Sequence, residues 1–318
     1  MSKIQKLRDY IQRRGVNYTL HFLIYKLGGG KKLRKIRNLL YFLVHDNLSA
    51  GYENDIDSWH SFVVLNKRYQ KFLKSLPEYE ISGQQSKNIW WCWLQGEDNA
   101  PELCKACLRS VRRNFSDYKI TIISETNLSD YVKIPDFILT KYKKGIIGRA
   151  HFADILRTML LVKYGGVWVD STVYCTGRND DLLKEPLFVY QDWKFDREQA
   201  CICSNWFLSA RKGDPILRTT LDLVLEYWRH HNYAINYFFY HLFFHMATER
   251  YNDEWVSMPR YSNIPPHLLQ FEMYRPYTEK RFKQICGGSD FHKLTYKNPQ
   301  MANRLEGTLY NYIVKDLS

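Results

Sequence analysis

The sequence predicts an α/β fold that has a helical N-terminal region and additional helices beyond its sheet. Residues 88–94 and 118–124 are short apolar runs typical of buried strands, and the segment between them has helical spacing. A further helix, over 151–163, leads through two glycines into another short apolar run. Because the first 80 residues are basic and helical in pattern, we divide the chain into a region 1–80 and an α/β domain 81–318.

The region 1–80 is expected to begin with two basic helices within residues 1–46, separated by three glycines at 28–30. Residues 1–50 contain eleven Lys or Arg and two Asp, which gives +9 of the total net charge of +13. This pattern is typical of helices that lie on an anionic membrane, and also of a helical appendage with a solvated basic face. We favour membrane contact. Because no nucleic-acid-binding motif accompanies the charge, we expect no nucleic-acid partner.

The composition and the hydrophobic pattern favour a folded protein without a membrane-spanning segment. With 318 residues and 45% hydrophobic content, the chain can bury a sizeable core. We find neither an apolar run of membrane-spanning length nor a secretory signal, and therefore expect a cytoplasmic protein, peripheral on the inner face of the cell membrane. The seven cysteines are then expected to be reduced, with Cys104 and Cys107 as buried thiols rather than zinc ligands. The 16% aromatic content suits either ring stacking in a site or a large aromatic core.

The order strand, helix, strand over residues 88–124 predicts a parallel βαβ unit with its helix at 101–114. Ligands of such sheets gather at the carboxyl ends of the strands, so Trp93, Gln95 and Ser124 are expected near a binding site. Residues 58–80 are expected to form a helix that ends near Pro77. Later expected elements are strands over 187–192 and 205–210, helices over 215–231 and 235–251, and a less regular segment at 291–297.

The segment HFADILRTMLLVKYGGVWVDST, residues 151–172, gives the sharpest indication of chemistry. Asp154 and Arg157 lie three residues apart and therefore on one side of their helix. The glycine pair allows a tight turn, and the short strand after it ends at Asp170. A carboxylate at that position can hold ribose hydroxyls or a divalent cation. The residues alone equally allow a structural ion pair and a turn-capping aspartate.

Residues from about 88 to 297 resemble the capsular polysaccharide synthesis proteins, a group similar to glycosyltransferase family 32 and its sugar-binding DXD-motif relatives. The matching segments are IWWCWLQGEDNAPELCKAC, GIIGRAHFADILR and KYGGVWVDST, with weaker matches at SNWFLSARKGDPIL and HKLTYK. The resemblance implies a GT-A-like, Rossmann-like sheet that binds a nucleotide sugar, and an enzyme that retains the anomeric configuration.

The resemblance also assigns roles to individual residues. It implies that Trp93 stacks on the nucleotide base, with Gln95 beside it, and that Asp154 and Arg157 contact the uridine and ribose. Asp170 matches the first aspartate of the DXD motif, close to ribose and metal. Two further sets are implied: Asn205 with Asp170 at the reacting sugar, and Lys293 with Lys297 at the diphosphate.

A divalent cation, Mn²⁺ or Mg²⁺, is the cofactor that the resemblance implies, with Asp170, Thr172 and His292 as its ligands. Here the sequence departs from the family pattern, because Thr172 stands where relatives have the second aspartate. A hydroxyl is a weaker ligand than a carboxylate, and His292 is expected to compensate. The alternative is an ordinary surface histidine beside two solvated lysines.

From these observations we expect a hexosyltransferase that uses a UDP-sugar, with galactose or glucose as the first guess. Its acceptor would be a glycan or lipid-linked sugar in bacterial capsular or surface polysaccharide synthesis. Two alternatives stay open: a glycosyltransferase that modifies proteins, and a catalytically inactive protein that binds nucleotide sugars. Thr172 in the DXD-like motif is the feature that keeps the second alternative in view.

Overall fold

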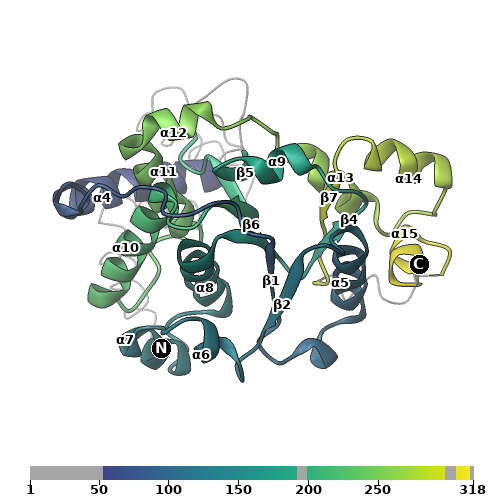
Figure 1. Cartoon of the computed structure of the whole chain (residues 1–318), viewed down its shortest axis with the longest axis horizontal. Coiled ribbons are helices and arrows are strands. Elements are labelled where there is room, and N and C mark those ends of the chain that lie inside the picture. Colours follow the sequence, from purple (N-terminus) through teal and green to yellow (C-terminus); the bar gives the residue numbers. More distant parts are fainter. Residues whose placement is uncertain (1–52, 192–198, 298–305, 316–318) are drawn as a thin grey trace, which may run out of the picture.

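The computed structural model describes residues 53–191, 199–297 and 306–315, so the two basic helices predicted within residues 1–50 lie outside the described residues. Its centre is a five-stranded sheet (Figure 1) with the strand order β2-β1-β3-β6-β5. The strands are β1 (Asn88–Cys92), β2 (Lys119–Ile123), β3 (Gly166–Val169), β5 (Leu187–Gln191) and β6 (Cys203–Ala210).

The sheet is mixed. β1 is parallel to β2 and to β3, whereas β6 is antiparallel to β3 and to β5. The predicted parallel βαβ unit is confirmed, with helix α5 (Glu102–Asn114) between its two strands. Because β6 runs in the opposite direction, its amino end and the carboxyl end of β5 lie at the same edge as the carboxyl ends of β1, β2 and β3. We call this the polar edge of the sheet.

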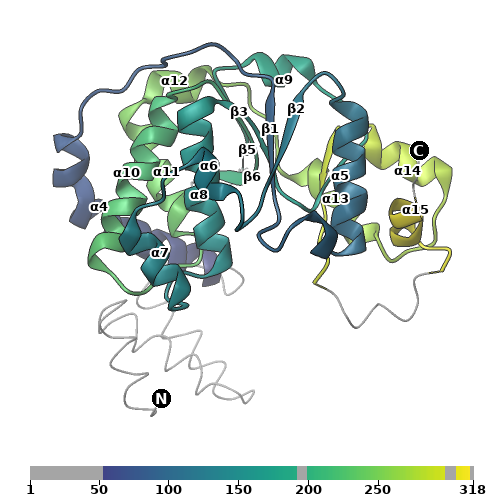
Figure 2. The same cartoon turned by 60° about the horizontal axis from the view of Figure 1, so that its bottom comes forward.

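Helices cover both faces of the sheet (Figure 2). One layer contains α4 (Glu53–Ser75), α8 (Arg149–Tyr164), α10 (Pro215–His230) and α11 (Phe239–Arg250). The other contains α5, which packs against α15 (Leu309–Lys315). The remaining helices are α6 (Leu128–Tyr131), α7 (Asp136–Lys143), α9 (Asp180–Lys184), α12 (Asn252–Ser257), α13 (Ile264–Glu272) and α14 (Glu279–Cys286), with a 3₁₀ turn at Glu97–Asn99. The α/β class with helical additions is therefore confirmed.

A second, two-stranded sheet lies beside the polar edge. It pairs β4 (Val173–Cys175) with β7 (Phe291–Lys293) in antiparallel orientation. Lys293 is the register partner of Val173, and the Leu294 N–H donates to the Thr172 carbonyl at 2.8 Å. This pairing brings residues 291–294 next to the DXD-like motif, which is about 120 residues earlier in the sequence.

Helix α4 belongs to the predicted region 1–80, yet it packs in one core with the helices of the α/β domain. Phe62, Leu65, Tyr69 and Leu73, spaced three or four residues apart, are buried in the same hydrophobic cluster as residues of α10 and α11. Burial of a large apolar side chain of this kind contributes about 1.5–3 kcal/mol. The four side chains therefore attach α4 firmly to the domain.

Two consecutive glycines form the turn between α8 and β3. Gly165 and Gly166 have φ angles of 67° and 99°, a region that favours glycine. A Cβ atom on Gly166 would lie 2.3 Å from the Asn88 carbonyl oxygen. The missing side chain therefore lets β3 pair closely with β1, and this pairing fixes the direction in which the chain delivers Asp170.

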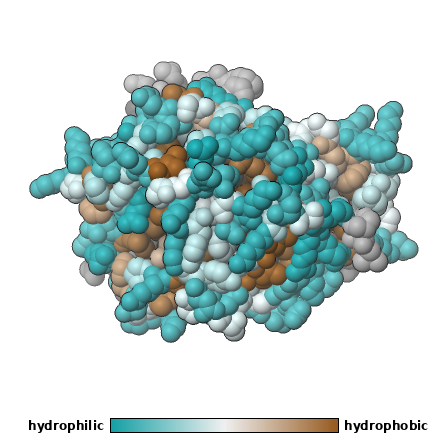
Figure 3. Space-filling view, viewed as in Figure 1, coloured by the Kyte–Doolittle hydropathy of each residue, from teal (hydrophilic) through white to brown (hydrophobic). Residues whose placement is uncertain are grey.

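The predicted helix over 235–251 begins four residues later than expected, at Phe239. The Asn236 side chain accepts a hydrogen bond from the Phe238 N–H at 2.7 Å, which favours a turn instead of a helical start. On the surface, the face shown in Figure 3 is largely hydrophilic, with hydrophobic colour in separate smaller areas. Among the described residues, no helix combines the length and the apolar character needed to cross a membrane.

Candidate active site

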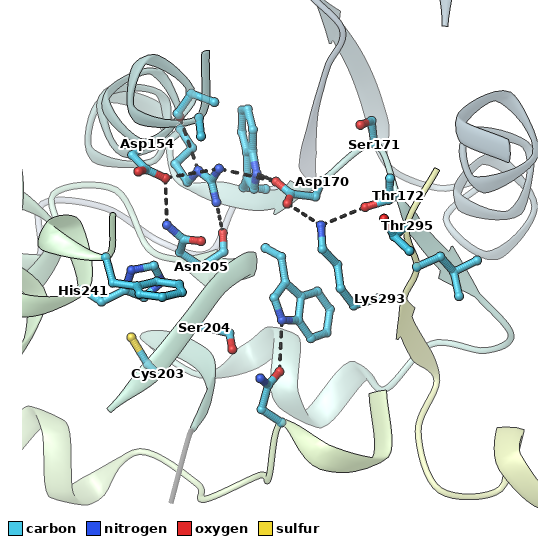
Figure 4. A pocket seen from close by; sticks show the side chains of 18 of the residues that line it. Asp154, Asp170, Ser171, Thr172, Cys203, Ser204, Asn205, His241, Lys293 and Thr295 are labelled. Atoms are coloured by element: carbon cyan, nitrogen blue, oxygen red, sulfur yellow. Dashed lines mark hydrogen bonds and ion pairs between the residues drawn. The ribbon is translucent and has the colours of Figure 1, made fainter. Parts of the chain in front are cut away.

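A cavity of about 900 Å³ opens at the polar edge (Figure 4). Its walls come from segments that are distant in sequence: 92–95, 149–157, 168–172, 199–206, 237–241, 262–270 and 293–297. The volume is in the range of ordinary small-molecule and cofactor sites. The sheet topology thus gathers, at one place, the segments that the sequence singled out for chemistry.

The Arg157 guanidinium lies between two carboxylates. Its Nη2 atom is 3.4 Å from Asp154 Oδ1, one helical turn away, and 3.5 Å from Asp170 Oδ1 at the end of β3. The guanidinium also donates to the Asn205 carbonyl oxygen and lies over the Trp168 ring, 5.1 Å from its centroid. Only 6% of the Arg157 side chain is exposed, so these contacts replace its hydration.

Burial and charge act in opposite directions on the two aspartates. Burial raises the pKa of Asp154 above its ordinary value, although Arg157 opposes this. Burial alone would also raise the pKa of Asp170, but Lys293 and Arg157 outweigh it and hold that pKa below its ordinary value. Asp170 is therefore ionised at neutral pH and carries the fixed negative charge of the site.

Strand β6 supplies Asn205 and Trp206. The Asn205 amide donates to Asp154 Oδ1 at 2.8 Å, and the Trp206 carbonyl accepts from the Asp170 N–H at 2.9 Å. The Trp206 indole stacks on Tyr190 at 4.9 Å and donates to Asn263 at 3.0 Å. Both aspartates are thus held by β6 as well as by their own elements, which makes the cluster rigid.

Lys293 forms the opposite side of the cluster. Its ammonium nitrogen lies 2.7 Å from Asp170 Oδ2 and 2.8 Å from Thr172 Oγ1 (Figure 4). The other Asp170 oxygen, Oδ1, accepts from the Trp168 indole at 2.8 Å. Both carboxylate oxygens of Asp170 are therefore engaged by donors from the chain.

The structure does not bring His292 to this cluster, contrary to its predicted place beside Asp170 and Thr172. Neighbouring residues of a strand point to opposite faces, so β7 directs Lys293 into the cavity and His292 away from it. The His292 side chain is fully buried, its Nε2 atom is 3.1 Å from Thr176 Oγ1, and burial lowers its pKa to about 4. The described structure thus offers Asp170 and Thr172, but not His292, toward a bound cation.

The other predicted donor-binding residues line the cavity. Trp93 follows β1, and its ring meets Tyr296 edge-on at 5.6 Å. Gln95 and Lys297 are exposed at the rim. The predicted residues that the cavity brings together are Trp93, Gln95, Asp154, Arg157, Asp170, Thr172, Asn205, Lys293 and Lys297.

Sequence reasoning missed His241, which reaches the cavity from α11. Burial, with Arg157 adding to it, lowers the pKa of His241 to about 3, so its imidazole is neutral at physiological pH. Its Nδ1 atom is buried and has no hydrogen-bond partner among the described residues. The only signal in the sequence is one polar residue among the aromatic side chains of FFYHLFF.

Comparison with known proteins identifies a family and several relatives of this chain. A family model described as "Capsular polysaccharide synthesis protein" matches residues 40–313. The chain is 26% identical over 158 residues to the O-glycosyltransferase braB of Annulohypoxylon truncatum. The aligned region covers 45% of this chain and 38% of braB. It is also 26% identical over 219 residues to inositol phosphoceramide mannosyltransferase 3 of Schizosaccharomyces pombe. This second aligned region covers 62% of this chain and 57% of that protein.

The chain therefore spans less than two thirds of the length of these curated relatives. Among solved structures, the PaToxG glycosyltransferase is similar, with 16% identity, a TM-score of 0.38, and coverage of 82% of this chain and 95% of PaToxG.

Proposed function

Because this chain belongs to the family of capsular polysaccharide synthesis proteins, we propose that it is a glycosyltransferase. In this proposal it moves a hexose, galactose or glucose, from a UDP-sugar to a lipid-linked glycan acceptor in bacterial surface polysaccharide synthesis. The anomeric configuration is retained, as the sequence resemblance implies. The matched relatives whose names include glycosyltransferase or mannosyltransferase support the general reaction.

One observation carries the proposal: an ionised carboxylate at the end of β3, balanced by two cations, faces a cavity large enough for a nucleotide sugar. Asp170 contacts Arg157 on one side and Lys293 on the other. Ribose hydroxyls suit a carboxylate acceptor, and a diphosphate suits the neighbouring ammonium. Trp93, at the end of β1, supplies an aromatic face for the base.

The rim of the cavity supports an acceptor that has an apolar part. Tyr237, Phe238 and Ile264 line the cavity and remain 63%, 40% and 63% exposed. Exposed apolar side chains beside a polar site favour an amphiphilic ligand over a free sugar. Together with the basic segment 1–50, this supports a location on the cytoplasmic face of the membrane.

The test is release of UDP from a panel of UDP-sugars by wild type and by Asp170→Asn, with Asp181→Asn on the exposed face of α9 as a matched control. We expect one donor to be used, and Asp170→Asn to lower kcat/KM by about 100-fold or more, because it removes the charge that organises both cations. A nuclear magnetic resonance spectrum of the first product reports the anomeric configuration. Equal turnover by wild type and Asp170→Asn would overturn the assignment of the site.

A further inference from the structure

The ammonium of Lys293 lies where the family resemblance would place a metal ion. It bridges Asp170 Oδ2 and Thr172 Oγ1 at 2.7 and 2.8 Å, and these are the two positions of the DXD-like motif that relatives use near the metal. The distances are those of charge-assisted hydrogen bonds. The lysine reaches this point because β7 pairs with β4 and turns residue 293 toward the cavity.

The residues present do not fit a divalent cation. Mg²⁺ and related ions bind through at least one or two carboxylates of the protein, with waters and substrate phosphate oxygens as the other ligands. Here the DXD-like motif has one carboxylate, Asp170, whose two oxygens already accept from Trp168 and Lys293, and the second motif position is the neutral Thr172. Within the described ranges, no group of three or more His, Cys, Asp or Glu residues has an arrangement that could hold a metal.

The charges of the cluster lead to the same conclusion. Asp154 and Asp170 contribute two negative charges when ionised, and Arg157 and Lys293 contribute two positive charges. A divalent cation is attracted by an excess of negative charge, which these four side chains do not offer. A cation placed between Asp170 and Thr172 would also have to displace the ammonium from both oxygens.

We propose that Lys293 takes the electrostatic role of the divalent cation, so that glycosyl transfer in this protein proceeds without a metal. The proposal rests on the glycosyltransferase function proposed above. An ammonium group has three N–H donors, and Asp170 and Thr172 occupy two of them. The third is available for an oxygen of the donor's diphosphate, beside the anion that holds the lysine in place.

The reaction step requires such a donor. The bond between the anomeric carbon and the diphosphate oxygen breaks, and its electron pair stays on that oxygen. The acceptor hydroxyl oxygen bonds to the anomeric carbon, and its proton passes to the diphosphate or to solvent. The leaving group gains one negative charge as the bond breaks, and a fixed ammonium stabilises this charge more in the transition state than in the ground state.

The first experiment measures UDP release by the full chain with excess EDTA and with added Mn²⁺. We expect wild-type rates to agree within about twofold in both conditions, because Lys293 already supplies the positive charge. Release that stops with EDTA and returns with Mn²⁺ would overturn the metal-free proposal but leave the glycosyltransferase function intact. Failure of every donor to release UDP, with no binding of UDP by calorimetry, would instead overturn the proposed function.

Variants of Lys293 separate its role from a general structural one. Lys293→Met is expected to lower kcat by about 100-fold or more and to weaken UDP binding in EDTA by about 10- to 100-fold, through loss of a hydrogen bond from a charged donor. The matched control is Lys280→Met on the exposed face of α14, with thermal unfolding to verify that each variant folds. Wild-type turnover by a folded Lys293→Met protein would contradict the proposal.

A second variant reverses the charge. Lys293→Glu places a second carboxylate beside Asp170, and we expect this protein to be inactive in EDTA and partly restored by Mn²⁺. Mn²⁺ binding without nucleotide, followed by electron paramagnetic resonance, should be detectable for Lys293→Glu and not for wild type. Stoichiometric Mn²⁺ binding by wild type that is lost in Asp170→Asn would show that Asp170 is a metal ligand and would overturn the proposal.

Discussion

Arg157 is the residue on which the candidate site depends most. Its guanidinium contacts two carboxylates, two carbonyl oxygens and one indole ring, which come from α8, β3 and β6. A planar fork with five donors suits such a multiple contact better than an ammonium does. The cluster therefore uses arginine where several groups must be held, and lysine where the contacts are with Asp170 and Thr172 alone.

Replacement of Arg157 by methionine should destabilise the protein strongly. Two carboxylates would then share a buried site with only Lys293 to balance them, and breaking a buried ion pair in this way costs about 3–5 kcal/mol. Unfolding in guanidinium chloride measures the change in the free energy of unfolding. Arg157→Lys, which keeps the charge but not the fork, is the matched control and should lose less. Equal stability of Arg157→Met and wild type would show that the cluster contributes little to folding.

At the scale of elements, the close pairing of β1 and β3 depends on glycine at one position. A Cβ on Gly166 would lie 2.3 Å from the Asn88 carbonyl oxygen, whereas a Cβ on Gly145, at φ 69°, would meet nothing within 4 Å. The two glycines thus separate the cost of an unfavourable backbone angle from the cost of a clash with a neighbouring strand.

Alanine at these two glycines should therefore have unequal effects. Gly145→Ala should lower the free energy of unfolding by about 1–2 kcal/mol, because alanine is unfavourable in the left-handed backbone conformation and meets no neighbour there. Gly166→Ala has the same backbone cost and must also push β3 away from β1. We expect this displacement to lower the free energy of unfolding by about another 1–3 kcal/mol. Chemical denaturation of both variants measures their free energies of unfolding. Equal decreases for the two variants would mean that displacing β3 from β1 has no energetic cost.

Helix α10 begins at a buried acidic cap. The Asp214 carboxylate accepts from the Leu217 N–H at 2.8 Å, and only 2% of the residue is exposed. Burial raises the pKa of Asp214 to about 7, and Glu254 on α12 adds to the shift. Because the folded-state pKa lies above the unfolded value of about 3.9, this group stabilises the fold at low pH and loses that contribution as the pH rises through about 7.

Substitution of this cap should change how stability depends on pH. Asp214→Asn keeps an acceptor for the helix end but cannot ionise. We expect the melting temperature of wild type to fall relative to that of Asp214→Asn between about pH 5 and pH 8. Thermal unfolding of both proteins across this interval measures the difference, and parallel curves would contradict the raised pKa.

Local patterns predicted the elements that carry their own periodicity. The helix over 151–163 and the strand ending before Asp170 follow from spacing and a glycine turn, and Asp154 and Arg157 fall on one side for the same reason. The late start of α11 was not predictable in this way, because the Asn236 side chain competes with the helix for a backbone donor. The places of Lys293 and His292 depend on the register of β7 with β4, about 120 residues away, which no local pattern specifies.

At the scale of the whole molecule, helices cover both faces of the central sheet (Figures 1 and 2). The cavity is lined by residues from the polar edge of that sheet. The cavity rim carries exposed apolar side chains, and the sequence before residue 53 carries most of the net positive charge. Both features motivate the proposal of contact with an anionic lipid surface, where the basic segment would concentrate the protein near the proposed lipid-linked acceptor.

Membrane binding should therefore depend on the basic residues of the N-terminal segment. In the full chain, Lys31, Lys32 and Lys35 changed to Gln should weaken binding to anionic vesicles by about 3 kcal/mol, since each basic residue near such a surface contributes about 1 kcal/mol. Vesicle sedimentation at moderate salt measures this. The control changes Lys143, Lys184 and Lys280 to Gln, which removes the same charge from the domain surface. Equal sedimentation of both triple variants would show that the segment does not bind membranes.

The alternation along β7 also limits how this site can evolve. A one-residue insertion before Phe291 would move His292 into the position of Lys293, but it would also move Lys293 into the position of the buried Leu294. The strand thus penalises length changes in the preceding turn. A substitution at residue 293 alone, by contrast, changes the group that faces Asp170 and Thr172 without moving His292 or Leu294 from its buried position.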